Sequence, residues 1–263
     1  MKAFVTGGSG FVGGTLVQML VSRGNTVKAL ARSERAADRI RALGAEPVRG
    51  DIEQLETLAQ GLSGCDVVFH TAAALDFGNN TSRQEQVNIE GTRNIIEATR
   101  RGGVKRLVTV SASSIIADGR PINNADESRP LPRHFVGPYS RTKAAAERLI
   151  LAANSASLTT VAVRPPGIWG LGDSSILPQM TQMAKSRQFI WFDHGRYAYT
   201  TCHVANVCEG LILAAERGRG GEAYFVTDGP PILFREFVLG LLGTQGLTVG
   251  ERSIPWRLAL SMA

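Results

Sequence analysis

The chain has 263 residues, enough for one large α/β domain or a domain with a smaller lobe, and its 43% hydrophobic and 20% charged residues are ordinary for a globular protein. A formal charge of +6 admits an anionic partner, but no basic block with interleaved aromatic residues occurs, so no nucleic acid is expected. No apolar run reaches the roughly 18 residues of a membrane span, and no signal segment precedes the first strand. The three cysteines, Cys65, Cys202 and Cys208, fit neither a metal spacing nor a disulfide framework. Together these features favour a cytoplasmic protein.

Short apolar runs alternate with helical patterns over the first half of the chain. Strands are predicted at residues 2–6, 26–31, 46–49, 66–70, 104–111 and 158–164. Helices are predicted at residues 10–23, 33–42, 55–62, 82–101 and 138–153. Strands that alternate with helices form βαβ units, so we expect an α/β fold with a Rossmann-type doubly wound parallel sheet.

The alternation loosens in the second half. Helices are predicted at residues 175–186, 204–216 and 233–242, with a short strand at 223–226. No flexible linker separates these segments from the first part. We therefore expect residues 1–165 to form the sheet domain and residues 166–263 to form mainly a small C-terminal lobe, interleaved with the sheet. The apolar residues 254–263 suggest the start of a helix, so the natural chain is expected to continue beyond Ala263.

A glycine-rich turn, TGGSGFVG, stands between the first strand and the first helix. Gly7, Gly10 and Gly13 have G-x-x-G-x-x-G spacing, which brings backbone N–H groups close to a ligand phosphate at the positive end of the helix dipole. The alternative is a tight turn in another kind of α/β protein. As a dinucleotide site, the turn would bind its ligand through Gly7, Ser9, Gly10, Phe11, Val12 and Gly13.

Polar or glycine-rich positions follow six of the predicted strands. They are Gly7, Arg32, Asp51, Thr71, Ser113 and Pro165. Ligands of open α/β sheets bind in the crevice outside the C-terminal ends of the strands. Six strand ends of this kind indicate a shared ligand site rather than packing alone.

The end of the second strand indicates which dinucleotide binds. A site for NAD usually has an acidic residue about 20 residues past the glycines, but this stretch reads LARS and has no carboxylate. Arg32 is able to bind a 2′-phosphate, or it is simply solvated. Three neighbours are able to assist it: Ser33, Arg35 and Arg39. We therefore expect NADP, with NAD as the less favoured cofactor. Asp51 and Ile52 are placed to border the adenine, although a plain turn aspartate fits Asp51 equally well.

A Y-x-x-x-K pair, Tyr139 and Lys143, lies on the helix predicted after the fifth strand. The i, i+4 spacing puts both side chains on one face, where an ammonium favours the phenolate of a tyrosine with an ordinary pKa near 10. Such a pair alone often marks only an exposed helix face. A serine cluster, Ser111, Ser113 and Ser114, precedes it. One serine hydroxyl and Tyr139 would bind a substrate carbonyl, Tyr139 would donate the proton, and Lys143 would lower the tyrosine pKa and hold the cofactor ribose.

Six motifs, TGGSGFVG, VFHTAA, VNIEGT, VSASS, YSRTK and VRPPGIWG, resemble those of the extended short-chain dehydrogenase/reductase family. The nearest branch contains 3β-hydroxysteroid dehydrogenases, dihydroflavonol-4-reductases and related NAD-dependent epimerase/dehydratases. The resemblance implies a Rossmann domain for NADP in residues 1–165 and a substrate lobe in residues 166–263. It implies Ser113, Tyr139 and Lys143 as catalytic residues. It further implies cofactor contacts at Arg32, Thr71, Ala72, Ala73, Asn88, Tyr139, Lys143, Pro165, Pro166 and Ile168.

The expected function is an NADP-dependent oxidoreductase that interconverts a ketone and a secondary alcohol on a fairly apolar, steroid-, flavonoid- or β-keto-type small molecule. The alternatives are a nucleotide-sugar epimerase or dehydratase with retained NAD, and a non-enzymatic NADP-binding regulator. Relatives commonly form a homodimer through the helices at residues 82–101 and 138–153, so a homodimer is expected here. Candidate pocket residues, each of which is equally suited to a core, are Leu75, Phe77, Ile168, Trp169, Leu177, Trp191 and Tyr197.

In one segment the chain departs from the family pattern. His203-Val204-Ala205-Asn206 has Ala205 where the family usually has an acidic residue, which puts a capping interaction in doubt. His203 itself is expected to be structural rather than a base.

Overall fold

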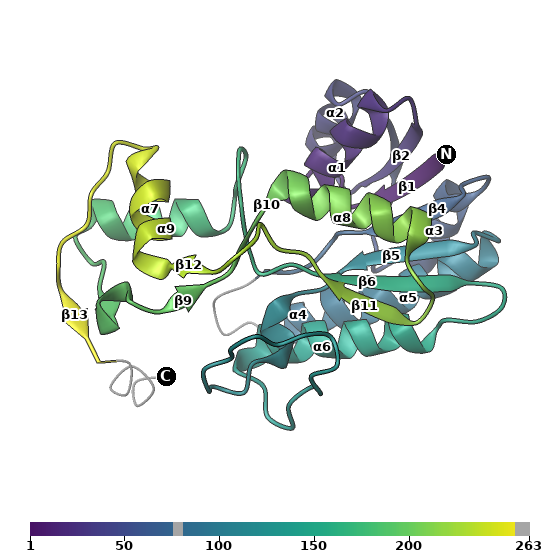
Figure 1. Cartoon of the computed structure of the whole chain (residues 1–263). Coiled ribbons are helices and arrows are strands. Elements are labelled where there is room, and N and C mark those ends of the chain that lie inside the picture. The colour runs from purple at the N-terminus through teal and green to yellow at the C-terminus, as the bar shows by residue number, and fades with distance from the viewer. Residues whose placement is uncertain (76–80, 256–263) are drawn as a thin grey trace. The chain divides into compact units, whose positions relative to one another are not determined.

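A computed structural model describes residues 1–75 and 81–255, and the chain divides into two units (Figure 1). We call Met1–Pro166 with Val204–Val226 the sheet unit, and Gly167–His203 with the residues from Thr227 onward the small unit. Each unit is described by itself below. Within residues 1–75 and 81–255, no helix combines the length and the apolar composition that crossing a membrane requires.

The sheet unit is built on a seven-stranded parallel sheet. Its strands are β1 (Lys2–Thr6), β2 (Thr26–Ala31), β3 (Glu46–Arg49), β4 (Val67–His70), β5 (Arg106–Val110), β6 (Thr159–Arg164) and β11 (Glu222–Phe225). The order is β3-β2-β1-β4-β5-β6-β11. This order confirms the expected doubly wound fold, and the direction of winding reverses between β1 and β4, where such sheets bind ligands.

Seven α-helices of the sheet unit flank these strands in the described part of the chain. They are α1 (Phe11–Ser22), α2 (Glu34–Ala42), α3 (Leu55–Leu62), α4 (Thr81–Gln84), α5 (Gly91–Arg101), α6 (Gly137–Ala152) and α8 (Val204–Arg217). The single helix predicted at residues 82–101 is divided, because a π-helical turn, Glu85–Glu90, separates α4 from α5. Figure 1 shows α8 on one face of the sheet and α5 and α6 on the other.

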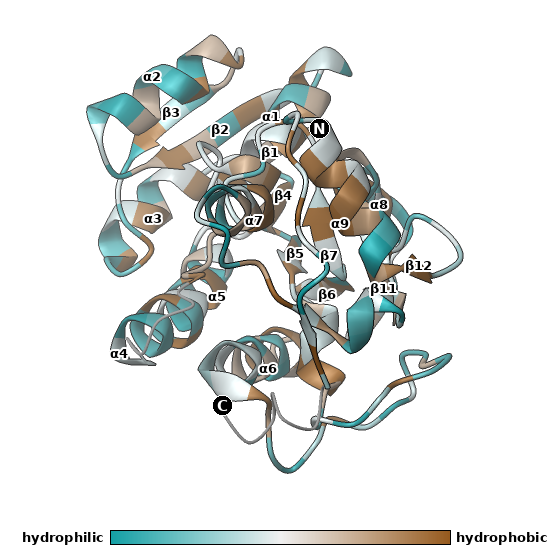
Figure 2. Ribbon diagram, turned by 90° about the vertical axis from the view of Figure 1, so that its left-hand side faces the viewer, coloured by the Kyte–Doolittle hydropathy of each residue, from teal (hydrophilic) through white to brown (hydrophobic). Residues whose placement is uncertain are grey.

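Burial of the strands holds this unit together. Residues 3–6 of β1 and all of β4 are buried, which gives the continuous apolar runs typical of parallel strands covered on both faces. One core cluster joins Phe4 of β1 to Leu58 of α3 and Ile95 of α5. Figure 2 shows the contrast between hydrophobic central strands and the largely hydrophilic helix α2, which has only Ala37 and Ile40 buried.

The small unit contains short elements around an aromatic core. They are β7 (Gly167–Trp169), α7 (Ile176–Lys185), β8 (Trp191–Phe192), a 3₁₀ turn (Asp193–Gly195), β9 (Ala198–Tyr199), β10 (Thr201–His203), β12 (Ile232–Leu233), α9 (Phe234–Gly243) and β13 (Ser253–Ile254). β7 pairs with β10, β9 with β12, and β8 with β13. The helix expected from residue 254 is therefore wrong at its start, because Ile254 pairs with Phe192, and residues 256–263 lie outside the described residues.

Trp191 belongs to the core of the small unit and does not line a pocket, which corrects its place among the candidate pocket residues. Its side chain is 1% exposed, and its indole N–H donates to the Gly250 carbonyl at 2.8 Å. The Arg235 guanidinium stacks over its ring at 4.8 Å, and Phe189 meets it edge-on. A fully enclosed indole with a satisfied N–H is a packing residue.

Candidate active site

The glycine turn after β1 has the geometry of a phosphate-binding turn. Gly7 has φ +72°, a conformation that glycine adopts at no steric cost. A Cβ on Gly13 would lie 2.2 Å from the Gly7 carbonyl oxygen, so α1 packs onto the turn more closely than any side chain would allow. A Cβ on Gly10 would approach only the Gly7 carbonyl oxygen, at 3.2 Å, which leaves that side of the turn open to a ligand. These are the three roles that the dinucleotide fingerprint assigns to its glycines.

The N-terminus of α1 also fits an anionic ligand. Gly10 is its N-cap, and within the described part of the chain no side chain caps the helix and no acidic residue occupies its first turn. α2 differs, because Ser33 caps it and accepts a bond from the Ala36 N–H at 3.2 Å. A helix end without a protein acceptor retains free N–H donors and a positive dipole end, which suits a pyrophosphate.

The segment after β4 packs directly on the glycine turn. Thr71 donates its hydroxyl to the Thr6 carbonyl at 2.7 Å, and the Ala72 N–H donates to the Thr6 hydroxyl at 3.3 Å. A Cβ on Gly7 would meet the Ala72 nitrogen at 2.9 Å. Ala73, the third residue predicted here, is exposed beside them. The structure therefore brings the ends of β1 and β4 together, as the sequence predicted.

The arginines after β2 divide into paired and free charges. Arg41 forms ion pairs with Glu34 and Asp38, at 2.8 and 2.7 Å. Within residues 1–75 and 81–255, three exposed arginines of the same stretch have no ion-pair partner, namely Arg32, Arg35 and Arg39. The uncompensated positive charge lies where a 2′-phosphate was predicted.

Asp51 and Ile52, which follow β3, are more buried than their predicted position beside the adenine suggested. The Asp51 carboxylate is half-buried and accepts a bond from the Glu53 N–H at 3.1 Å, as in a turn aspartate. Ile52 is 5% exposed and belongs to the core, where its side chain would lie 2.7 Å from a Cβ on Gly91. Any ligand contact by Ile52 must therefore involve its backbone.

Tyr139 and Lys143 lie on the same face of α6. Lys143 is 6% exposed, and its ammonium donates to the Val110 carbonyl at the end of β5, at 2.7 Å. Tyr139 is partly buried against a cluster that contains Ile115, Ile116 and Ala144. In the described part of the chain its hydroxyl has no hydrogen-bond partner in the protein. The phenol is thus available to a ligand.

Burial shifts the pKa values of both groups. It raises the pKa of Tyr139 to about 12, and it lowers the pKa of Lys143 to about 8, with Glu147 as the opposing influence. The sequence predicted that Lys143 would lower the tyrosine pKa, and the shift has the opposite sign here. The ammonium donates a bond to the Val110 carbonyl, and burial is the cause of the raised tyrosine pKa.

The serines follow β5 on a 3₁₀ turn, Ser113–Ile116. The Ser113 N–H donates to the Pro165 carbonyl at 2.9 Å, which joins this turn to the segment after β6. The hydroxyls of Ser111 and Ser114 are buried and have no hydrogen-bond partner among the described residues. Ser113 is half-buried and is not among these enclosed hydroxyls, so its selection from the family resemblance stays a prediction.

A buried polar network lies beneath these groups, and its central residue, His70, was not singled out from the sequence. The imidazole of His70 contacts the Thr6 hydroxyl at 2.8 Å and the Thr92 hydroxyl at 3.2 Å. Thr92 donates its own proton to the Asn88 carbonyl at 2.6 Å, so Nε2 of His70 must donate to Thr92, and Nδ1 must accept from Thr6. This arrangement holds a neutral imidazole, and burial together with the charge of Lys143 lowers its pKa to about 3.

Asn88 continues the network toward α6. Its side chain accepts from the Ala74 N–H at 2.8 Å and donates to the Ala74 carbonyl at 3.2 Å and to the Thr142 hydroxyl at 3.1 Å. Thr142 in turn donates to the Tyr139 carbonyl at 3.0 Å. Asn88 is 2% exposed, so it supports the site from beneath. A histidine at the end of a buried strand, in VFHTAA, was the sequence signal for this network.

The remaining predicted residues divide between the two units. Pro165 and Pro166 follow β6 in the sheet unit, whereas Ile168 lies on β7 of the small unit, where it pairs with Cys202. Leu75 is exposed at 44%, and Phe77 lies outside the described residues. Three other pocket candidates are at least partly exposed in the small unit: Trp169, Leu177 and Tyr197.

A carboxylate of the small unit, Asp228, accepts hydrogen bonds around His203. The Asp228 side chain accepts from the His203 N–H at 2.6 Å, the Trp169 indole at 2.7 Å and the Thr201 hydroxyl at 2.9 Å. The His203 ring meets Trp169 edge-on at 4.8 Å. These contacts are consistent with a structural His203.

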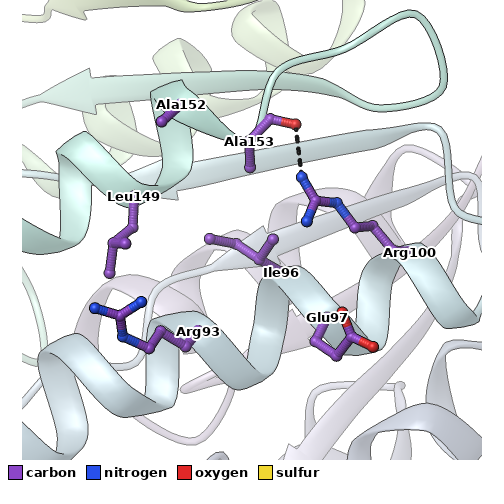
Figure 3. A pocket seen from close by; sticks show the side chains of 7 residues that line it. All are labelled: Arg93, Ile96, Glu97, Arg100, Leu149, Ala152 and Ala153. Carbon is purple, nitrogen blue, oxygen red and sulfur yellow. Dashed lines mark hydrogen bonds between the residues drawn. The ribbon is translucent and has the colours of Figure 1, made fainter.

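A hollow of about 400 Å³ lies between α5 and α6 of the sheet unit. Figure 3 shows its lining, which is Arg93, Ile96, Glu97, Arg100, Leu149, Ala152 and Ala153. Arg100 spans the two helices and donates to the Ala153 carbonyl at 3.3 Å. None of these is a predicted site residue. The hollow lies on the two helices through which a homodimer is predicted, and that prediction stays open.

Comparison with known proteins gives a family match over nearly the whole chain. The profile of the 3-beta hydroxysteroid dehydrogenase/isomerase family matches residues 4–259. The chain is 48% identical to 4-hydroxy-2-methyl-3-oxo-4-farnesyl-3,4-dihydroquinoline-1-oxide ketoreductase of Stigmatella aurantiaca, over 100% of this chain and 79% of that protein. It is 35% identical to 2-alkyl-3-oxoalkanoate reductase of Stenotrophomonas maltophilia, over 98% and 80% of the two chains.

A solved structure supports the fold. The crystal structure of a dTDP-glucose 4,6-dehydratase double mutant from Streptomyces venezuelae, with NAD bound, superposes with a TM-score of 0.82. The match covers 97% of this chain and 84% of the dehydratase, at 24% identity. At this level of identity the likeness concerns the Rossmann fold alone.

The close approach of α1 to the glycine turn predicts that Gly13→Ala is destabilising. The new methyl would overlap the Gly7 carbonyl oxygen, so we expect a loss of about 1–3 kcal/mol in the free energy of unfolding, measured by urea denaturation. Gly240→Ala in α9 is the matched control, because no described atom lies within 4 Å of its new Cβ, and it should gain about 0.5–1 kcal/mol. A Gly13→Ala protein as stable as the parent would contradict the packing.

The depressed pKa of His70 predicts acid sensitivity. The unfolded chain binds a proton at this histidine with a pKa near 6.5 and the folded chain only near 3, so stability is lost as pH falls below 6.5. At pH 5 the loss should be about 2 kcal/mol relative to neutral pH. Urea denaturation at both pH values should show a smaller drop for His70→Gln, and an unchanged drop for the exposed control His134→Gln. Equal drops in the parent, His70→Gln and His134→Gln would contradict the lowered pKa of His70.

Proposed function

The chain belongs to the 3-beta hydroxysteroid dehydrogenase/isomerase family and is an oxidoreductase of the short-chain dehydrogenase/reductase type, and from this premise we propose that it reduces an apolar ketone with NADPH. The observation that carries the proposal is the Tyr139–Lys143 pair at the carboxyl edge of the sheet, with the ammonium bonded to Val110 and the phenol free of protein partners. The same sheet unit holds the glycine turn at the end of β1.

The cofactor in this proposal is NADP. The pyrophosphate would lie on the uncapped N-terminus of α1, above the turn of Gly7, Gly10 and Gly13. The 2′-phosphate would meet Arg32, with Arg35 and Arg39 supplying further positive charge. When bound, the reduced nicotinamide supplies the hydride for the carbonyl carbon. The proton and the hydrogen bonds to the carbonyl oxygen would come from side chains of this protein.

Tyr139 is the proposed proton donor. With a pKa raised to about 12, its phenol stays protonated through the neutral range, which is the form that donates a proton to a carbonyl oxygen. The Ser113 hydroxyl would donate a hydrogen bond to the same oxygen as negative charge develops there. Lys143 would then stabilise the tyrosinate by its positive charge. Alcohol oxidation would require the phenolate, which is the minor form of Tyr139 at neutral pH.

The proposed substrate is a bulky apolar ketone. The relative from Stigmatella aurantiaca is named for a ketone on a farnesylated quinoline oxide, and the family name refers to hydroxysteroids. Both are polycyclic and largely apolar. The exposed apolar side chains of Leu171 and Tyr197 in the small unit are compatible with a substrate of this kind. Within this class we propose no single compound.

Tyr139→Phe tests the reaction type. We expect the variant to lose about 100-fold or more in kcat on a ketone found in a panel of steroid, quinoline and β-keto substrates, followed by NADPH absorbance, because the proton donor is removed. NADPH affinity should change little. Tyr224→Phe is the control, since Tyr224 lies on the edge strand β11 and its hydroxyl accepts from the Arg219 N–H. Full activity of Tyr139→Phe, or bound NAD with no net NADPH turnover in the parent, would count against the proposal.

Arg32→Glu tests the cofactor. We expect KM for NADPH to rise by about 10- to 100-fold, because a charge-assisted bond to phosphate is lost, while KM for NADH falls or stays constant. Arg41→Gln is the control, because its guanidinium is already occupied by Glu34 and Asp38. A parent protein that uses NADH as well as NADPH, with no response to Arg32→Glu, would contradict the NADP assignment.

A further inference from the structure

A buried carboxylate, Glu147, lies one helical turn beyond Lys143 on α6. Tyr139, Lys143 and Glu147 are spaced by four residues, so they share one face of the helix. Glu147 is 2% exposed and accepts two bonds from Arg164, Nε to Oε2 at 2.9 Å and Nη2 to Oε1 at 2.6 Å. Arg164 ends β6, is 6% exposed and lies over the Phe225 ring at 5.5 Å. A pair buried this deeply carries a large desolvation cost, which the two hydrogen bonds offset in part.

The Arg164–Glu147 ion pair bears on which acceptor the Lys143 ammonium binds. A lysine and a glutamate at i, i+4 are within reach of each other on a helix, although the order with glutamate first is the more favourable one. Here the ammonium of Lys143 donates to the Val110 carbonyl, and both carboxylate oxygens of Glu147 are taken by Arg164. The arginine therefore keeps Glu147 from capturing Lys143 and leaves the ammonium at the carboxyl end of β5.

The same elements are joined by further bonds around the candidate site. The Arg164–Glu147 pair links β6 to α6, and the next residue, Pro165, accepts the N–H of Ser113. Together with the bond from Lys143 to Val110, these contacts connect α6 to β5 and β6, and β6 to the turn that carries Ser113. Loss of the ion pair would therefore change the positions of both Lys143 and Ser113.

We propose that Glu147 is a positioning residue for Lys143: clamped by Arg164, its carboxylate holds a negative charge one turn from the ammonium without drawing it away from Val110. This role rests on the function proposed above for Lys143. The titratable groups coupled to the lysine are neutral His70 from β4 and Glu147 on its own helix. Burial lowers the pKa of Lys143, and Glu147 is the acidic group, among the described residues, that raises it again.

The first test measures Lys143 in the cofactor-free protein. Competitive labelling with acetic anhydride across a pH series, read by peptide mass spectrometry, gives the midpoint at which the amine becomes reactive. Glu147→Gln should lower this midpoint by about one pH unit. Glu85→Gln is the control, because Glu85 pairs with the exposed Arg141 of the same helix, and it should leave the midpoint unchanged. An unchanged midpoint in Glu147→Gln overturns the proposal. If that variant does not fold, Glu147→Gln/Arg164→Met, which removes both buried charges, serves for the same measurement.

The second test uses the double variant in turnover with NADPH. Arg164→Met frees the Glu147 carboxylate to capture Lys143, so kcat should fall by about 10- to 100-fold with a smaller change in KM. Glu147→Gln/Arg164→Met should recover part of kcat, because no carboxylate remains to capture the lysine. A double variant no faster than Arg164→Met would mean a merely structural pair. The labelling test needs no turnover, so failure of the proposed reaction appears in Tyr139→Phe and failure of this inference appears in the Lys143 midpoint.

Discussion

A chain of buried hydrogen bonds connects the turn after β1 to helix α6. It runs from Thr6 through His70 and Thr92 to Asn88, and from there through Thr142 to the backbone of Tyr139. Each member is buried or nearly so, and an unmade hydrogen bond in such surroundings costs more than a made one gains. The network therefore holds β1, β4, the π-helical turn and α6 in one arrangement, which fixes the position of the glycine turn relative to Tyr139.

Burial does more than hold the candidate site together, because it also sets the charge states there. The same low-dielectric surroundings keep His70 neutral, keep the Tyr139 phenol protonated and lower the pKa of Lys143. Burial lowers the pKa of Lys143 to about 8, and the charge of Glu147 offsets part of that effect.

Local sequence patterns located nearly all elements of the sheet unit, because strand and helix periods and glycine caps are short-range signals. The helix at residues 82–101 was predicted as continuous, and the structure interrupts it with a π-helical turn at Asn88, whose side chain is occupied by Ala74 and Thr142. The short strands of the small unit were missed, since two- and three-residue pairings have no periodicity to detect. Trp191 was placed among pocket candidates because an apolar pattern does not distinguish a pocket from a core.

The sequence by itself determined the doubly wound sheet, the phosphate turn, the absence of an acid after β2 and the Tyr139–Lys143 pair. These features depend on residue type and on spacing within a few turns of chain. Only the tertiary structure decided which groups are charged and what they touch: the direction of the Tyr139 pKa shift, the bond from Lys143 to Val110, the histidine beneath the glycine turn and the clamp of Arg164 on Glu147. The reason is physical, since desolvation and buried hydrogen bonds depend on partners far apart in the chain, which no local pattern contains.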